Sequence, residues 1–167
     1  MKVGVLGFGY AGFDSFKEQL DRTGHYTVNL GDNAQTIAAR ALLLKLGVRA
    51  EDIITVDRDT LPSYDGEPVA LIMNGVFRRG FPISPKVRPI FVGFHARPGV
   101  VEQNREWLKQ HEPIGCRDIE TAASLIANGI AAFTTGCITL TLPARTSSPP
   151  QAKLLVISGA GAGALPE

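Results

Sequence analysis

A run of apolar residues in the middle of the chain, Val69-Ala70-Leu71-Ile72-Met73, ends at the polar turn Asn74-Gly75. Runs of this length that are rich in apolar residues and stop at a turn are typical of buried strands. Similar runs occur at 3–6, 53–56, 90–94 and 114–116, and segments with helical periodicity lie between them. This alternation predicts an α/β fold with a mainly parallel, Rossmann-like sheet of about six strands.

The clearest helix is predicted from Asp32 to Leu46, with Asp32 as its N-cap, Gln35 at the spacing of a capping box and Gly47 as its stop. Another helix is expected at 119–128, behind Asp118 as its N-cap. The remaining elements predicted from periodicity are a helix carrying Phe13, Phe16 and Leu20 on one face, a helix at 100–110, and strands at 131–133 and 138–142.

Composition limits the class of protein. The chain has 167 residues, of which 44% are hydrophobic and 20% charged, values typical of a soluble globular domain. With 17 Lys and Arg against 16 Asp and Glu, it has no overall field that would recruit nucleic acid. The absence of a membrane-length apolar run and of a signal-like start favours a cytoplasmic location, where both cysteines stay reduced.

The end of the chain differs from the rest. Residues 1–142 are expected to form the α/β lobe, whereas 143–167 combine a Pro/Ser linker, a strand candidate at 153–157 and a Gly/Ala tail. Fewer than the roughly 30 residues of a βαβ unit follow the linker, so a second domain is not expected there. Since the strand candidate has no crossover helix to cover it, we expect a homo-oligomer or a partner chain.

Charge is unevenly distributed along the chain. Residues 76–117 hold 8 Lys and Arg against 3 Asp and Glu. Scattered solvated charges are the simpler interpretation, and a pocket for a small phosphate or carboxylate is the more specific one.

A glycine motif follows the first predicted strand. Gly7-Phe8-Gly9-Tyr10-Ala11-Gly12 matches the G-x-G-x-x-G pattern of dinucleotide sites. Such sites place an acidic residue about 20 positions further on, at the end of the second strand, to hold the ribose. The nearest candidate, Asp32, is better explained as a helix cap. A glycine turn is therefore favoured, and an NAD-binding oxidoreductase domain is the alternative.

Polar residues follow three of the predicted strands. Asn74, His95 and Arg117 each lie at the carboxyl end of an apolar run, and ligands of open parallel sheets bind beyond those ends. His95 is a candidate general acid or base, and Arg117 a candidate for binding a carboxylate or phosphate. The structural alternatives are a hydrogen-bonded histidine at a strand end and an arginine paired with Asp118 or Asp32.

Five segments together resemble the polysaccharide pyruvyl transferase family, in their order and combination. They lie at 29–35 (Asn-Leu-Gly-Asp-Asn-Ala-Gln), 71–75 (Leu-Ile-Met-Asn-Gly), 89–95 (Pro-Ile-Phe-Val-Gly-Phe-His), 113–121 (Pro-Ile-Gly-Cys-Arg-Asp-Ile-Glu-Thr) and 136–142 (Gly-Cys-Ile-Thr-Leu-Thr-Leu). The resemblance covers roughly residues 26–142 and corresponds to the N-terminal lobe of a two-lobed fold of the B-type glycosyltransferase kind.

The resemblance implies transfer of a pyruvyl group from phosphoenolpyruvate to a sugar in glycan biosynthesis, with no cofactor and no metal ion. Its motifs assign catalytic roles to His95 and Arg117, and substrate-binding roles to Asn29, Gly31, Asp32, Asn74, Gly75 and Asp118. The expected ligand of the site is an anionic small molecule or a sugar. Because only one lobe is matched, we expect another chain to complete the site. A non-catalytic anion-binding module is a further alternative.

Overall fold

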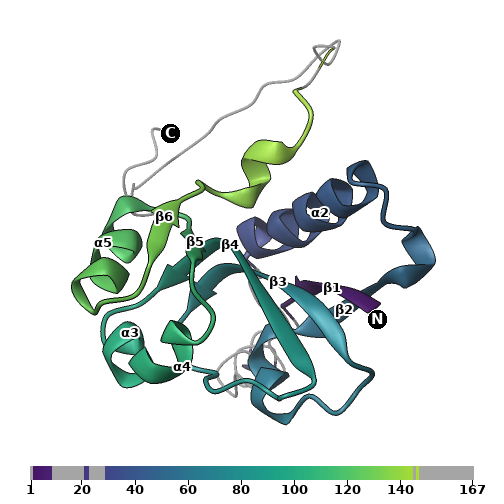
Figure 1. Cartoon of the computed structure of the whole chain (residues 1–167). Coiled ribbons are helices and arrows are strands. Elements are labelled where there is room, and N and C mark those ends of the chain that lie inside the picture. Colours follow the sequence, from purple (N-terminus) through teal and green to yellow (C-terminus); the bar gives the residue numbers. More distant parts are fainter. Residues whose placement is uncertain (1, 9–20, 23–28, 145, 147–167) are drawn as a thin grey trace.

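A six-stranded, entirely parallel sheet forms the centre of the computed structural model, which describes residues 2–8, 21–22, 29–144 and 146 (Figure 1). The strand order is β2-β1-β3-β4-β5-β6. The strands are β1 (Lys2–Gly7), β2 (Ile53–Asp57), β3 (Val69–Phe77), β4 (Val87–Ala96), β5 (Ile114–Cys116) and β6 (Ala132–Thr134). The predicted α/β, Rossmann-like fold is confirmed.

Strands β3 and β4 run further than predicted. The turn expected at Asn74-Gly75 lies inside β3, because the pairing with β4 shifts register between Met73 and Gly75 and then continues to Phe77. Gly75 has a φ of 85°, which a residue with a side chain rarely adopts, so this glycine lets the strand bend without ending. Asn74 is therefore a fully buried strand residue.

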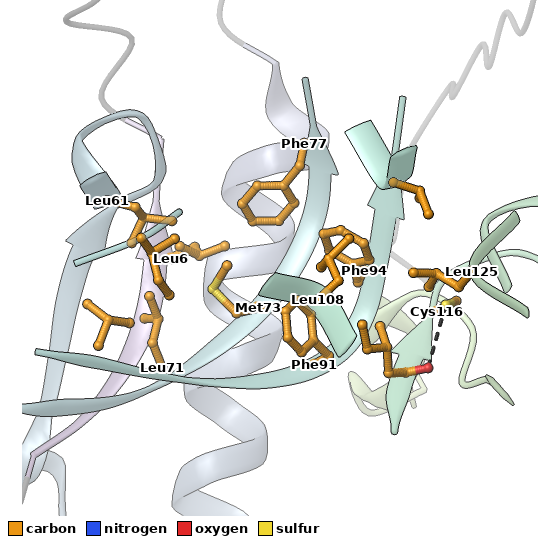
Figure 2. Packing of buried hydrophobic residues seen from close by; sticks show 14 of the residues in the cluster. Leu6, Leu61, Leu71, Met73, Phe77, Phe91, Phe94, Leu108, Cys116 and Leu125 are labelled. Carbon is orange, nitrogen blue, oxygen red and sulfur yellow. Dashed lines mark hydrogen bonds between the residues drawn. The ribbon is translucent and has the colours of Figure 1, made fainter. Parts of the chain in front are cut away.

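Both faces of the sheet are covered, as the unbroken apolar strands require. Helix α2 (Leu30–Lys45) covers one face (Figure 1), and its Ala38 and Ala39 belong to the same buried cluster as Ile72 of β3. Helices α3 (Val100–Gln103), α4 (Arg105–Lys109) and α5 (Ile119–Ala127) contribute to the larger cluster on the other face. Figure 2 shows the side chains of that cluster, from Leu6 and Leu61 through Phe94 to Leu125.

Three predicted elements need correction. Helix α2 begins at Leu30 with Asn29 as its N-cap, so Asp32 lies within the first turn and is not a cap. The predicted helix at 100–110 is two short helices separated at Asn104, whose side-chain amide donates to the Val100 carbonyl over 2.8 Å. The strand expected at 138–142 is the 3₁₀-helix η3 (Ile138–Thr141). The alternation of apolar and polar residues in this segment is typical of a strand, but only Ile138 is buried, in the cluster that contains Ala38 and Ala39, whereas Leu140 is 78% exposed.

The connection between β3 and β4 contains no helix. Parallel neighbours usually need a crossover of a dozen or more residues, yet residues 78–86 alone return the chain to the start of β4. Phe81 packs against Phe77 and Trp107, with ring centroids 5.4 and 5.1 Å away. The Ser84 amide donates to Leu61 in the 3₁₀-helix η2 (Arg58–Ser63), which follows β2. Aromatic packing thus replaces a crossover helix on this face.

Several expectations lie outside the described residues. They are the helix carrying Phe13, Phe16 and Leu20, most of the glycine motif, and nearly all of the linker, strand candidate and tail at 143–167.

Another 3₁₀-helix, η1 (Ala50–Asp52), precedes β2. Within the described part of the chain, every helix is too short or too polar to cross a membrane.

Candidate functional site

His95 and Asp118 form the closest polar contact at the carboxyl edge of the sheet. His95 lies near the end of β4, and its Nδ1 is 2.5 Å from Oδ2 of Asp118, which follows β5 by two residues. An ionised carboxylate only accepts hydrogen bonds, so Nδ1 carries the proton and donates it to Asp118. The other ring nitrogen, Nε2, is then the one available to a ligand, and the His95 side chain is 22% exposed.

Asp118 is held in place by the helix that it caps. Its Oδ1 accepts from the backbone N–H of Thr121 over 2.9 Å, as the predicted N-cap of α5 requires. Burial acts to raise the pKa of Asp118, but the hydrogen bonds from Thr121 and His95 outweigh it and lower the pKa to about 2. Asp118 therefore stays ionised near neutral pH and fixes the tautomer of His95.

Arg117 completes this group. Its backbone N–H donates to the carbonyl of Phe94 over 2.8 Å, which places the residue level with His95 on the neighbouring strand. Its Nε is 3.6 Å from the same Asp118 oxygen that His95 contacts, and its side chain is 30% exposed. One carboxylate thus faces both an arginine and a histidine, and the expected pairing of Arg117 with Asp118 coexists with access to solvent.

A second polar group is buried between α2 and β3. The Asn74 side-chain amide donates to Oε1 of Gln35 over 3.5 Å, and a side chain on Gly75 would meet Gln35 at 3.3 Å. Both Asn74 and Gln35 are buried, and the Asn74 Oδ1 accepts no hydrogen bond from the described residues. Asn74 therefore contacts α2, whereas His95 contacts the start of α5.

Arg58 borders this second group. Its side chain is only 12% exposed, and its guanidinium group lies 3.9 Å from Asp32 and 3.2 Å from Asp59. It also donates to the Val76 carbonyl over 3.2 Å and covers the ring of Phe8 at 4.7 Å. Arg58 thus ties the end of β2 to β1, β3 and α2 through structural contacts.

The beginning of α2 carries the other residues of the resemblance. Asn29 Oδ1 accepts from the Gly31 N–H over 2.9 Å, and both residues are exposed. Asp32 follows within the first turn and is buried. The structure therefore brings Asp32, Asn74 and Gly75 around one helix start, and His95, Arg117 and Asp118 around another.

Sequence reasoning missed two polar residues at this edge. Thr121 is 3% exposed and its Oγ1 lies 3.3 Å from the Nδ1 of His95; its place three residues after the predicted cap Asp118 was the available signal. Asp57 ends β2 and pairs in register with Gly7 of β1. Because α2 lies between β1 and β2 in the sequence, the acid at the end of the second strand is about 50 residues beyond Gly7, further than the usual spacing of about 20.

Other chemistry in the described residues is less suited to a site. Burial, with Asp118 nearby, raises the pKa of the Cys116 thiol to about 11, so it is protonated and unreactive. A hollow at the opposite edge is lined by Lys2, Asp52, Glu67 and Pro68, but Lys2 and Asp52 already pair. Nowhere in the described ranges do three His, Cys, Asp or Glu side chains gather as they would around a metal ion.

Comparison with known proteins identifies no relative of this chain. No family model matches the chain, and no curated protein or solved structure matches it. The two polar groups at the carboxyl edge of the sheet are therefore the features from which a function is inferred.

Proposed function

We propose that the chain is a transferase-like lobe that binds an anionic small molecule at the carboxyl edge of its sheet. In this proposal His95 exchanges a proton with the substrate and Arg117 binds its negative charge. The reaction class is the one implied by the resemblance, pyruvyl transfer from phosphoenolpyruvate to a sugar in glycan biosynthesis. The observation that carries the proposal is the 2.5 Å contact between His95 Nδ1 and Asp118 Oδ2.

That contact supports an acid–base role for His95. A histidine whose Nδ1–H is held by a carboxylate presents its Nε2 in a defined orientation, as in many acid–base pairs. In pyruvyl transfer two sugar hydroxyls add to C2 of phosphoenolpyruvate, C3 gains one proton, and phosphate leaves with the other. Nε2 of His95 is the proposed acceptor of a hydroxyl proton, and Asp118 is the group that orients it.

The second polar group supports the substrate-binding assignments. Asp32 lies in the first turn of α2, and Asn74 and Gly75, from a segment far away in the sequence, lie against Gln35 of the same helix. This start lies near β1 and β3, where Thr36 of α2 donates to the Leu6 carbonyl over 2.7 Å. The strand order reverses between β1 and β3, and such reversal points are where open α/β sheets bind ligands.

The test is thermal protection and calorimetric titration with phosphoenolpyruvate. We expect wild-type protein to bind it saturably, and Arg117→Ala to lose most of this binding because a charge-assisted contact is removed. Arg88→Ala is the matched control, since Arg88 is an exposed arginine at the other end of β4. If Arg117→Ala lowers stability without ligand but leaves the protection intact, Arg117 is structural and the proposal is wrong.

A nucleotide-cofactor site is the second candidate, and one observation favours it. Asp57 ends the strand beside β1, in register with Gly7, which is where a ribose acid lies in dinucleotide-binding folds. Against it, Asp57 Oδ1 already accepts from the Asp59 N–H over 2.9 Å as the cap of η2. We expect no specific binding of NAD by calorimetry. Saturable micromolar binding that is lost in Asp57→Ala would make this candidate the leading one.

Association with a second copy or a partner chain remains a prediction, as does the cytoplasmic location. Sedimentation of the full chain across micromolar concentrations tests the first, and a strict monomer would contradict it.

A further inference from the structure

Arginine follows the last residue of four successive strands. Arg58, Arg78, Arg97 and Arg117 come directly after β2, β3, β4 and β5. Because all strands are parallel, all four residues lie at the carboxyl edge of the sheet, the edge that holds His95. The sequence alone shows an excess of positive charge at 76–117, but not that an arginine follows each of these strands.

Two of these arginines have structural partners and two do not. Arg58 pairs with Asp59, and Arg117 lies against Asp118. The side chains of Arg78 and Arg97 are exposed, and neither makes an ion pair or hydrogen bond with any of the residues that the structure describes. The two arginines that follow the central strands are therefore positive charges without a counter-charge among the described residues.

Arg78 and Arg97 are also neighbours. Phe77 and Ala96 are the last register pair of β3 and β4, and the backbone N–H of Arg97 donates to the Phe77 carbonyl over 2.9 Å. Arg78 and Arg97 each follow one member of that pair, on strands whose backbones lie about 4.8 Å apart. Two arginines on neighbouring backbone positions can turn their guanidinium groups toward one anion, whose charge offsets the repulsion between them.

We propose that Arg78 and Arg97 form a phosphate-binding subsite beside the His95–Asp118 pair. The inference deepens the proposed function and rests on it for the location of the chemistry: the substrate class is a small molecule with a terminal phosphate. Two guanidinium forks match the oxygens of a phosphate dianion, which accepts paired hydrogen bonds from each. Arg97 lies two residues beyond His95 along the chain, so the bound phosphate is adjacent to the proton-transfer group.

A small molecule fits this pair better than a nucleic acid. Arg78 and Arg97 are one pair rather than a long stripe, and the formal charge of the whole chain is only +1. Binding to a polynucleotide draws on many phosphate contacts spread along a surface. We therefore commit to a single phosphate group, and nucleic-acid binding is an outcome of the test that would overturn the proposal.

The experiment titrates the full chain with inorganic phosphate at constant ionic strength, by calorimetry and thermal shift. We expect saturable binding by wild type, at least tenfold weaker binding by the double variant Arg78→Ala/Arg97→Ala, and unchanged binding by Arg88→Ala. Arg88 is the matched control because it is exposed on β4 at the opposite edge, with Ala70 as its register partner. Circular dichroism checks that each variant keeps the fold.

The double variant Arg78→Lys/Arg97→Lys refines the test. It keeps both charges but loses the guanidinium forks, so we expect intermediate binding. Equal phosphate binding by wild type and the alanine double variant would overturn the subsite, as would no binding by wild type at millimolar phosphate. Tight binding of a single-stranded oligonucleotide, lost in the double variant, would overturn it in favour of nucleic acid. Arg117→Ala distinguishes the two proposals. We expect this variant to weaken the binding of phosphoenolpyruvate but to leave the binding of inorganic phosphate at the subsite unchanged.

Discussion

The two edges of the sheet use charge in different ways. At the amino edge, Lys2 lies 3.4 Å from Asp52, Arg49 lies 2.8 Å from the same aspartate, and Lys86 pairs with Asp65. At the carboxyl edge Arg58 pairs with Asp59, and Asp118 faces both His95 and Arg117. The arginines after β3 and β4, in contrast, have no acidic partner in the described chain.

This difference separates charge that supports the surface from charge that is available to a ligand. Ion pairs at the amino edge cancel locally, and exposed pairs of this kind contribute little to stability. Arg78 and Arg97 at the carboxyl edge are exposed and have no counter-charge within the described residues, so their charges are not cancelled locally. Substitutions at both edges of the sheet test this contrast, beginning with the largest expected effect.

Substitution of a glycine should be far more costly near the carboxyl edge. A Cβ on Gly115 of β5 would lie 2.6 Å from the Phe91 carbonyl oxygen, a backbone atom of the neighbouring strand. We expect Gly115→Ala to lower the free energy of unfolding by about 3 kcal/mol, as overpacking does when the backbone must move. Chemical denaturation measures this change.

Gly66→Ala is the matched control at the amino edge. Its Cβ would meet only the outer atoms of the Tyr64 ring and hydroxyl, the far end of a side chain that can shift. We expect a loss below about 1 kcal/mol. Equal losses for the two variants would contradict the expectation that a Cβ facing backbone, as at Gly115, is tolerated less well than one facing a movable side chain, as at Gly66.

Removal of Asp118 should have the next largest effect. Asp118→Ala deletes the cap of α5 and the partner of His95, so we expect the free energy of unfolding at pH 7 to fall by about 2 kcal/mol. Asp52→Ala at the amino edge should lose less, because both its partners are on the surface. Urea titrations of the two variants in parallel give the comparison.

The charge of Asp118 also predicts a pH dependence. Its folded pKa of about 2 lies below the unfolded value of about 4. Its ionisation therefore stabilises the fold fully above about pH 5, and this contribution is lost as the pH falls toward 2. Asp118→Asn keeps a side chain that can cap a helix, so its stability should approach that of wild type in acid. A difference that stays constant from pH 7 to pH 2.5 would show that the charge is not responsible.

The smallest effect is expected for the exposed pair of Lys86 and Asp65. The Asp65 side chain is 91% exposed, so water screens the pair and 0.5 M salt should change little. We expect the thermal midpoint of Asp65→Ala to match that of wild type within error, with and without salt. A clear drop at low salt alone would mean that the amino edge also depends on its charges.

The strands were predictable where apolar runs are continuous, and less so where glycine changes the backbone. The short strand β5 has its predicted bounds, whereas the prediction for β3 stops at Met73, because nothing local shows that Gly75 allows a bend within a strand. The start of α2 was misplaced because Asn29 and Asp32 are both good caps, and tertiary burial of Asp32 decides between them.

The candidate site was predictable in its residues and not in its grouping. Following strand ends identified His95, Arg117 and Asp118, which the structure brings into contact. The same reasoning placed Asn74 beside them, but its side chain faces α2, because the residue lies within β3 and not after it. The role of Arg78 and Arg97 depends on strand order, which a linear count of charges cannot supply.

The crossover without a helix also has a consequence for the order in which the chain folds. Val69 pairs with Val87 about 18 residues later, whereas Val3 pairs with Ile53 about 50 residues later, so closing the first loop costs about 1 kcal/mol less entropy. The pairing of β3 and β4 is therefore favoured to form first, with Phe77 and Phe81 already in contact across the connection. The two strands that lead into Arg78 and Arg97 are thus the expected nucleus onto which the rest of the sheet is added.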